Sequence, residues 1–162
     1  QGWEKLQKPE VRQKVFERIN EFEDMFHPHV KDGIHRLREL IVSESHVVSN
    51  ALQKHLSRKR RVVGHFDARQ SNIAWHPEHG PKLIDWSWAS PTVAGTDRTM
   101  FIIDLFKSGY DVQPLVPYNL DPEHTLLQIG HWAVRSTNPS PKGDETVRFH
   151  QLASAVTAAT LL

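Results

Sequence analysis

The chain contains no cysteine among its 162 residues. This absence excludes a disulfide scaffold and any metal site built from thiolates, and it is compatible with a reducing compartment. The chain also lacks an apolar run long enough to span a bilayer, and its first residues do not have the pattern of a signal peptide. We therefore expect no membrane partner.

Glycine is sparse, with eight residues at positions 2, 33, 64, 80, 95, 109, 130 and 143. No two of these positions are close enough to form a G-x-G-x-x-G or Walker loop. The sequence therefore has no glycine-rich loop of its own that could bind phosphates.

Neither sign of charge is in large excess, because 20 lysines and arginines face 19 aspartates and glutamates. A net charge of +1 argues against a mainly electrostatic nucleic-acid binder. The basic run at residues 58–61 could form a nucleic-acid or targeting patch, but cations at the end of a helix also complement its dipole. Length and composition are those of one compact soluble domain.

Several segments repeat apolar residues at helical spacing, which predicts a mainly helical fold. We expect the first two amphipathic helices to pack together, with the strands described next packed against them. The predicted helices span residues 9–27, 34–56, 97–107, 122–135 and 145–161.

A short β-rich region separates the second and third predicted helices. Residues 62–64 read as a buried strand, and the loop 65–71 follows it. Residues 72–75 and 81–85 are β-compatible runs on either side of His76–Gly80, whose proline and glycine favour a hairpin connection. The fold class predicted from the pattern is α+β, mainly α.

The hairpin would bring two oxygen-bearing side chains together. If Trp75 pairs with Lys82, then Asn72 faces Asp85, with Cβ atoms about 5 Å apart. One carboxylate and one amide oxygen are suitable ligands for Mg²⁺, which otherwise keeps water or substrate phosphate. Asp67, five residues before Asn72, is then free to address the hydroxyl of an acceptor.

The same residues also have simpler interpretations. Asp67 and Asn72 are common turn formers, Asp85 can be a carboxylate at a strand end, and His65 can be a hydrogen-bonded core histidine. Arg69 could contact a phosphate or the acceptor, or it could be solvated or paired with a neighbouring carboxylate.

The segment from Val62 to about Leu105 resembles the catalytic lobe of the aminoglycoside phosphotransferase and choline-kinase-like family. The family pattern is approximately H-G-D-x-x-x-x-N, then a hydrophobic residue followed by D-[WF], then a helix that carries Asp-Leu. The matching residues are His65, Asp67, Asn72, Asp85, Trp86 and Asp104-Leu105.

The resemblance implies the helical C-terminal lobe of a protein-kinase-like fold with a small catalytic β-hairpin. It implies that Asp67 is the catalytic base or positions the hydroxyl, and that Asn72 and Asp85 hold Mg²⁺ on the phosphates of ATP. His65 and Asp104 would support the loop, with Arg69 and Trp86 beside it. The implied function is transfer of the γ-phosphate to a hydroxyl of a small molecule, with the cytoplasm as the natural location.

Three features depart from the family pattern. Phe66 replaces the usual glycine, Ser87 follows Asp-Trp where an acidic residue is common, and Ser90–Thr96 is longer than the usual Gly-Asp-Pro link. These differences indicate a divergent branch, so the acceptor cannot be inherited from the family name.

The chain begins Gln1-Gly-Trp, its only methionines are Met25 and Met100, and members of the family are longer. We therefore expect residues 1–162 to be a C-terminal catalytic and acceptor-binding lobe, with the N-terminal nucleotide-binding lobe absent from this chain. Such a fragment should have little or no kinase activity alone.

Other features leave alternatives open. The pairs His27/His29 and His76/His79 could indicate zinc, but neither has a second pair at ligand spacing. Five aromatic residues could stack on a sugar or enclose a cation, although core packing is the usual fate; they are Trp86, Trp88, Tyr110, Tyr118 and Trp132. Residues 87–162 lack the acidic bias that a polycationic aminoglycoside would require.

Two further functions therefore remain beside the phosphotransferase. One is a non-catalytic kinase-like module for binding or interaction, and the other is a nucleic-acid-binding helical domain that rests only on the basic run.

Overall fold

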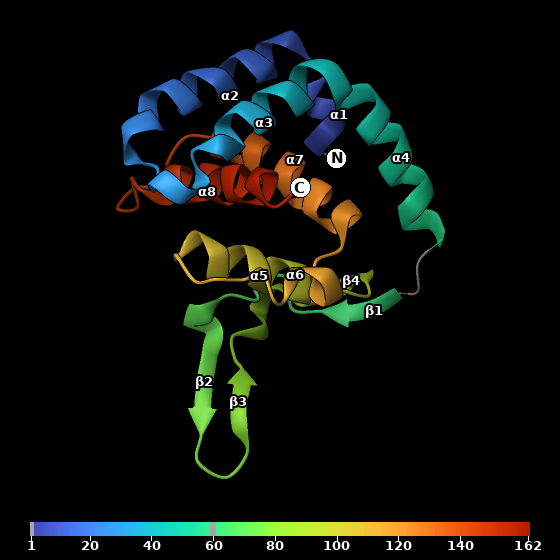
Figure 1. The fold of residues 1–162 in the computed structure, drawn as a ribbon, viewed down its shortest axis with the longest axis vertical. Coiled ribbons are helices and arrows are strands. Elements are labelled where there is room, and N and C mark those ends of the chain that lie inside the picture. Colours follow the sequence, from blue (N-terminus) through green and yellow to red (C-terminus); the bar gives the residue numbers. More distant parts are fainter. Residues whose placement is uncertain (1, 59–60) are drawn as a thin grey trace.

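The computed structural model describes residues 2–58 and 61–162, and within them the fold is mainly helical, with two small antiparallel sheets (Figure 1). The helices are α1 (Gly2–Leu6), α2 (Pro9–Phe22), α3 (Asp32–Glu39), α4 (Ser45–Arg58), α5 (Thr96–Lys107), α6 (Val116–Asn119), α7 (Pro122–Ser136) and α8 (Val147–Thr160). The strands are β1 (Arg61–Gly64), β2 (Ile73–His76), β3 (Gly80–Leu83) and β4 (Ser90–Val93). No helix of the described residues has the length and apolar character needed to cross a membrane.

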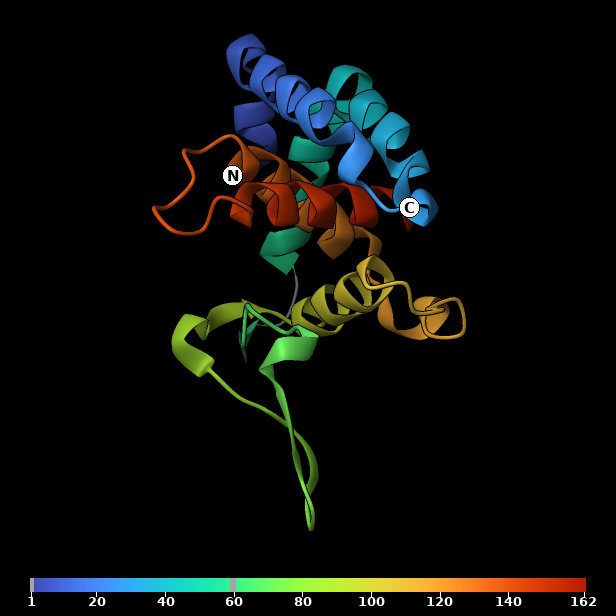
Figure 2. The ribbon, with the colours of Figure 1, turned by 90° about the vertical axis from the view of Figure 1, so that its left-hand side faces the viewer.

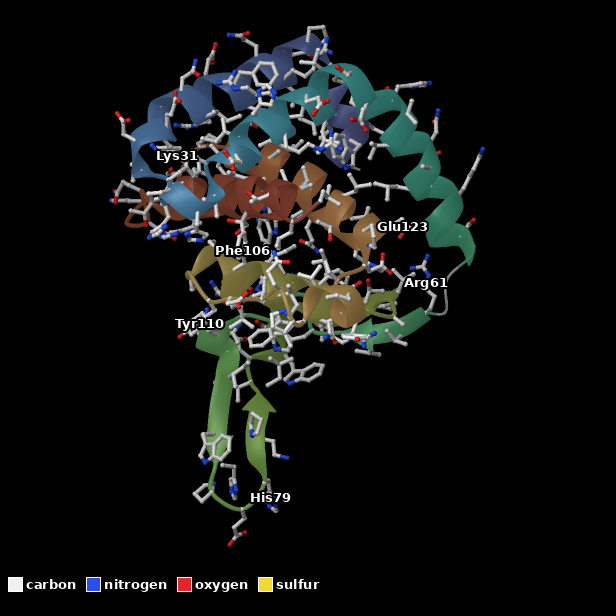
Figure 3. The ribbon with its side chains drawn as sticks, viewed as in Figure 1. Lys31, Arg61, His79, Phe106, Tyr110 and Glu123 are labelled. Carbon is white, nitrogen blue, oxygen red and sulfur yellow. The ribbon has the colours of Figure 1, made fainter. Side chains whose placement is uncertain are left out.

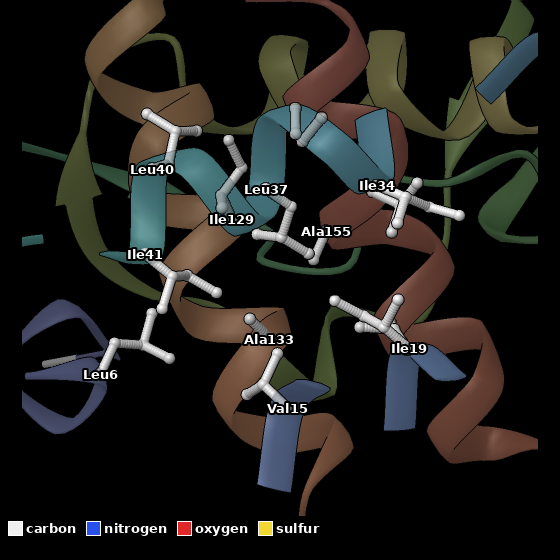
Figure 4. Packing of buried hydrophobic residues seen from close by; sticks show 14 of the residues in the cluster. Leu6, Val15, Ile19, Ile34, Leu37, Leu40, Ile41, Ile129, Ala133 and Ala155 are labelled. Carbon is white, nitrogen blue, oxygen red and sulfur yellow. The ribbon is translucent and has the colours of Figure 1, made fainter. Parts of the chain in front are cut away.

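The hydrophobic core lies among α1–α4, α7 and α8, which form the larger, upper part of Figure 1. The first two predicted helices contribute residues to the same buried cluster, and at the surface Arg38 of α3 donates a hydrogen bond to Asn20 of α2 at 2.7 Å. Figure 4 shows the packing of core residues that include Leu6, Val15, Ile19, Ile34, Leu37, Leu40, Ile41, Ile129, Ala133 and Ala155.

Local signals explain where several helices begin and end. Pro9 and Pro122 occupy the first position of α2 and α7, where the missing N–H costs no hydrogen bond. The Asp121 carboxylate accepts a hydrogen bond from the backbone N–H of His124 and caps α7. Gly109, at φ 88°, follows the end of α5 in the left-handed conformation that favours glycine.

All five predicted helical segments are helical, with changes at their ends. The second is not a single α-helix, because a π-helical turn at Leu40–Glu44 joins α3 to α4. The short helices α1 and α6 were not predicted, since five or four residues show too little periodicity to be recognised.

The first sheet pairs β1 with β4, in a register that places Arg61 opposite Val93 and Gly64 opposite Ser90. The segment expected to be only a longer link therefore contains a strand. The prediction of a buried β1 is wrong, because Val63 is 69% exposed while Gly64 is buried. A two-stranded sheet with one covered face buries alternate residues only.

Contrary to the expectation from the sequence, the strands do not pack against the first two predicted helices. The β1–β4 sheet lies beside α5, and the β2–β3 hairpin projects away from the helical body (Figure 2). Figure 3 labels His79 at the distal end of this hairpin. The predicted catalytic strands are therefore supported by α5 instead.

The predicted hairpin is present, but its register was wrong by one residue. Ile73 pairs with Leu83 and His76 with Gly80, so only three residues form the connection. Gly80 has φ 68°, and the N–H of His79 donates to the carbonyl of His76 at 3.3 Å. A three-residue loop closed by a left-handed glycine is a common hairpin form. Gly80 therefore belongs to the ladder.

Candidate active site

A closed ring of hydrogen bonds connects the 65–71 loop to the two residues that flank the hairpin, one before β2 and one after β3. Asn72 Nδ2 donates to Asp67 Oδ2 at 2.8 Å, and the Asp67 N–H donates to His65 Nδ1 at 3.2 Å. His65 Nε2 lies 2.7 Å from the carbonyl oxygen of Ile84, and the Ile84 N–H donates to the Asn72 carbonyl at 2.8 Å. The ring therefore joins three of the predicted positions to the residue that precedes the fourth, Asp85.

The ring also defines the form of His65. Its Nδ1 accepts a hydrogen bond and its Nε2 faces a carbonyl, so the neutral imidazole with a proton on Nε2 satisfies both contacts. The residue is completely buried and lies edge-to-face with Trp86, with ring centroids 4.8 Å apart. These contacts hold the start of the loop against the end of the hairpin.

The carboxylate of Asp67 has one oxygen engaged and one open. Oδ2 accepts from Asn72 and pairs with Arg69 Nη2 at 3.0 Å, whereas Oδ1 has no partner within residues 2–58 and 61–162. The side chain is 20% exposed and lines a cavity. The two contacts of Oδ2 fix the orientation of the carboxylate while Oδ1 stays accessible.

Asn72 and Asp85 do not face each other across the ladder, because Asn72 is opposite Ile84. Asp85 follows β3 with φ 58° and ψ 68°, a left-handed conformation that turns the chain out of the strand. Its Oδ1 accepts from the Ser87 hydroxyl at 2.6 Å. In the described part of the chain, Asp85 Oδ2 and Asn72 Oδ1 have no hydrogen-bond partner.

The side chain of Asp85 stays ionised at lower pH than an ordinary aspartate does. Hydrogen bonds from the hydroxyl and then the backbone N–H of Ser87 lower the pKa of Asp85, and the charge of Arg69 acts in the same direction. Arg69 therefore acts on both Asp67, its direct partner, and Asp85.

A second aspartate ties the loop to α5. The N–H of Gln70 donates to Asp104 Oδ2 at 2.9 Å, and Lys107 Nζ pairs with Asp104 Oδ1 at 3.1 Å. Burial would raise the pKa of Asp104, but the Gln70 hydrogen bonds and the Lys107 charge outweigh it and keep the pKa lowered. Asp104 is therefore ionised and tethers the middle of the loop.

Asp97 anchors the start of the loop and was not singled out from the sequence. Its carboxylate accepts from the N–H of His65 at 2.8 Å and from the N–H of Phe66 at 3.0 Å. Asp97 lies 32 residues after His65. Only its place in the first turn of a predicted helix was visible, so no local signal indicated this contact.

A cavity of about 490 Å³ opens beside Asp67. It lies between the loop, α5, α7 and α8, and it is wide enough for a small molecule. Asn72 and Asp85 are outside its lining. The residues that line it include Phe66, Asp67, Arg69, Trp88, Met100, Ile103, Asp104, Lys107, Gln128, His131, Trp132, Arg135, His150 and Gln151.

The aromatic residues of interest divide into two groups. Trp88 and Trp132 line the cavity, although Trp88 is also 65% exposed, whereas Trp86, Tyr110 and Tyr118 lie outside it and are 52%, 57% and 82% exposed. Core packing, the usual fate expected for most of them, is therefore wrong for the exposed ones. Trp86 Nε1 donates to the carbonyl of Leu83 and so helps to fix the turn after β3.

The remaining sequence features lie away from this cavity. His27 contacts His29, and the rings of His76 and His79 stack at the end of the hairpin, 4.5 Å apart. Among the described residues, no three His, Cys, Asp or Glu side chains form a group that could hold a metal. The proposed pair Asn72 and Asp85 contains only one residue of these four types, so it is a different kind of site. In the basic run, Lys59 and Arg60 lie outside the described residues.

Comparisons of this chain with protein-family models, with curated proteins and with solved structures find no match.

Proposed function

We propose that this chain is the catalytic lobe of an ATP-dependent phosphotransferase, which transfers the γ-phosphate to a hydroxyl of a small molecule. The main support is the Asp67 carboxylate, which is oriented through Oδ2 and open at Oδ1 beside a cavity of small-molecule size. An oriented carboxylate that reaches the acceptor hydroxyl is the part that the protein must supply in such a reaction. The kinase-like architecture and the nucleotide-binding partner lobe belong to this proposal.

The donor set also fits a hard cation. Asn72 Nδ2 is committed to two oxygens of Asp67, which leaves Oδ1 as the available atom, and Asp85 keeps an unpartnered Oδ2. An amide oxygen and an ionised carboxylate are suitable ligands for Mg²⁺. Asn72 and Asp85 would hold the metal, which would neutralise charge on the nucleotide phosphates when bound.

The roles of the remaining residues follow from their contacts. Asp67 would orient the acceptor hydroxyl and accept its proton through Oδ1. The guanidinium of Arg69 would stay paired with Asp67 Oδ2 and leave Oδ1 for the acceptor. The His65 imidazole and the Asp97 carboxylate hold the loop in place, so the two sides of the site keep a fixed spacing.

Two observations favour the alternative, a non-catalytic kinase-like module. Ser87 occupies one oxygen of Asp85, and Arg69 occupies one oxygen of Asp67. A module of this kind would bind a small molecule in the cavity without transferring phosphate.

Metal binding to the 162-residue chain is the first test. Mn²⁺, a paramagnetic substitute for Mg²⁺, should broaden the NMR signals of Asn72 and Asp85, and Mg²⁺ should reverse the effect. Asp85→Ala should weaken this binding, whereas Asp67→Asn and the exposed control Asp24→Asn should not. No broadening at this site, or equal effects of all three substitutions, would contradict the metal assignment.

Transfer is tested in the complete natural protein. Asp67→Asn should leave Mg²⁺·ATP binding intact and reduce phosphoryl transfer about 10²- to 10⁴-fold, the usual loss for a catalytic acid or base. Asp85→Ala should weaken nucleotide binding itself. If the complete protein binds no Mg²⁺·ATP at millimolar concentrations, the non-catalytic module is the better interpretation.

A further inference from the structure

The wall of the cavity opposite the loop is built from one face of each of two helices. Gln128, His131 and Arg135 are spaced three and four residues apart on α7, so they lie on the same side of that helix. On α8, His150 and Gln151 take the corresponding place. This face is polar but carries no acidic residue.

The charges that line the cavity do not cancel. Asp67 pairs with Arg69 at 3.0 Å and Asp104 pairs with Lys107 at 3.1 Å, so each acid has its own cation. Arg135 also lines the cavity and has no ion-pair partner in residues 2–58 and 61–162. The excess charge of the cavity is therefore positive and lies at Arg135.

Arg135 is also in the last turn of α7, where a cation complements the helix dipole. The helix dipole alone does not explain why the Arg135 side chain lines the cavity. Burial lowers the pKa of the adjacent His131, and the charge of Arg135 lowers it further. His131 is therefore a hydrogen-bonding group beside the fixed charge of the arginine.

Apolar side chains also line the cavity that Arg135 and Asp67 share. They include Phe66, Met100, Ile103 and Trp132. A ligand that contacts both the arginine and the aspartate would therefore also meet apolar surface.

We propose that the cavity binds an anionic hydroxyl compound with an apolar or aromatic body, whose carboxylate or phosphate pairs with Arg135. The hydroxyl then faces Asp67, a direction that rests on the proposed phosphotransferase function. A cationic acceptor is disfavoured, because it would lose water next to an arginine that it repels.

Three para-substituted benzene probes that share a hydroxymethyl group separate charge from shape. Hydroxymethylbenzoate is anionic, bis(hydroxymethyl)benzene is neutral and aminomethyl benzyl alcohol is cationic. Each is titrated near neutral pH into the isotope-labelled 162-residue chain without nucleotide or metal, and NMR shifts of cavity residues are followed. The anionic probe should bind most tightly.

Substitution of the arginine tests the contact itself. Arg135→Gln should weaken binding of the anionic probe about tenfold, the usual effect of one charge-assisted hydrogen bond. The neutral probe should bind this variant as before, which shows that the cavity is intact, and Arg135→Lys should restore part of the loss. The matched control Arg98→Gln, an exposed arginine of α5 outside the cavity, should change nothing.

Several results would overturn the inference. They are tighter binding of the neutral or cationic probe, an equal loss in the Arg98→Gln control, and no shifts of cavity residues at millimolar probe. The test involves no phosphoryl transfer. If the anionic probe binds through Arg135 while the complete protein shows no transfer, the phosphotransferase proposal fails and the binding inference stands.

Discussion

At the scale of single residues, the candidate site contains unusual backbone conformations. Phe66 and Asp85 are the non-glycine residues with positive φ in the described chain, at 62° and 58°. Such conformations cost free energy and persist where surrounding contacts hold them. Asp97 holds Phe66 through its N–H, and Ser87 holds Asp85 through its carboxylate. Both strained residues therefore lie at the proposed catalytic loop and metal site.

The strain at Phe66 predicts that glycine at this position gives a more stable protein than alanine, the reverse of the usual order. Phe66→Gly and Phe66→Ala lose the same aromatic contacts, but only glycine adopts positive φ without a steric cost. We therefore expect the glycine variant to be more stable than the alanine variant by about 1 kcal/mol. Chemical denaturation measures the difference. The ordinary order, with alanine more stable, would show that the left-handed conformation is absent in solution.

The residue types of the site could be predicted from the sequence better than their connections. Asp67 and Asn72 are only five residues apart, so the sequence alone predicts that they lie near each other, and they are hydrogen-bonded. The contact of His65 with Asp97 spans 32 residues, and no pattern in the sequence indicates which helix supports the loop. Arg135 was missed for a different reason, because a lone arginine at a helix end is already explained by its interaction with the helix dipole.

At the scale of secondary structure, close contact between α3 and α8 depends on one glycine. A Cβ atom on Gly33 would overlap the Val156 carbonyl oxygen and the Thr160 hydroxyl oxygen. Four buried alanines also make α8 a narrow helix; they are Ala153, Ala155, Ala158 and Ala159. The two helix backbones therefore approach closely, and the core excludes larger side chains between them.

Gly33→Ala should consequently destabilise the protein. An alanine in an ordinary helix interior is about 1 kcal/mol more favourable than glycine, but overpacking here should cost more, for a net loss of about 1–2 kcal/mol. Thermal or chemical unfolding measures the effect. His35→Ala, at an exposed position of the same helix, is the control and should have little effect. A stabilised Gly33→Ala variant would mean that the helices lie farther apart.

Long elements were predictable because their apolar periodicity is strong, but register was not. Sequence patterning placed the hairpin correctly, yet whether Gly80 joins the ladder or the loop depends on its φ of 68°. That single residue shifts every cross-strand pair and moves Asp85 out of the position opposite Asn72. The strand β4 was missed because its partner, β1, lies 26 residues earlier at Gly64↔Ser90.

At the scale of the whole molecule, the core and the cavity adjoin, whereas the hairpin lies apart from both. The core lies mainly among the upper helices of Figure 1, and Ile103 of α5 belongs to the core and also lines the cavity. The hairpin buries little of its own surface, since Trp75 is 75% exposed and Ile84 is 44% exposed. The predicted metal-binding residues therefore lie next to an element that adds little to the core.

This arrangement predicts two levels of protection against amide hydrogen exchange. Elements with few buried contacts open locally, whereas core helices exchange only when the whole protein unfolds. Amides of β2 and β3 should be at least about a hundredfold less protected than those of α7 and α8, a difference of roughly 2.7 kcal/mol in opening free energy. Low concentrations of urea should speed exchange at Ile129 and Leu152 but not in the hairpin, because local opening exposes little surface. Equal protection and equal urea dependence in both regions would show that the hairpin and the core unfold as one unit.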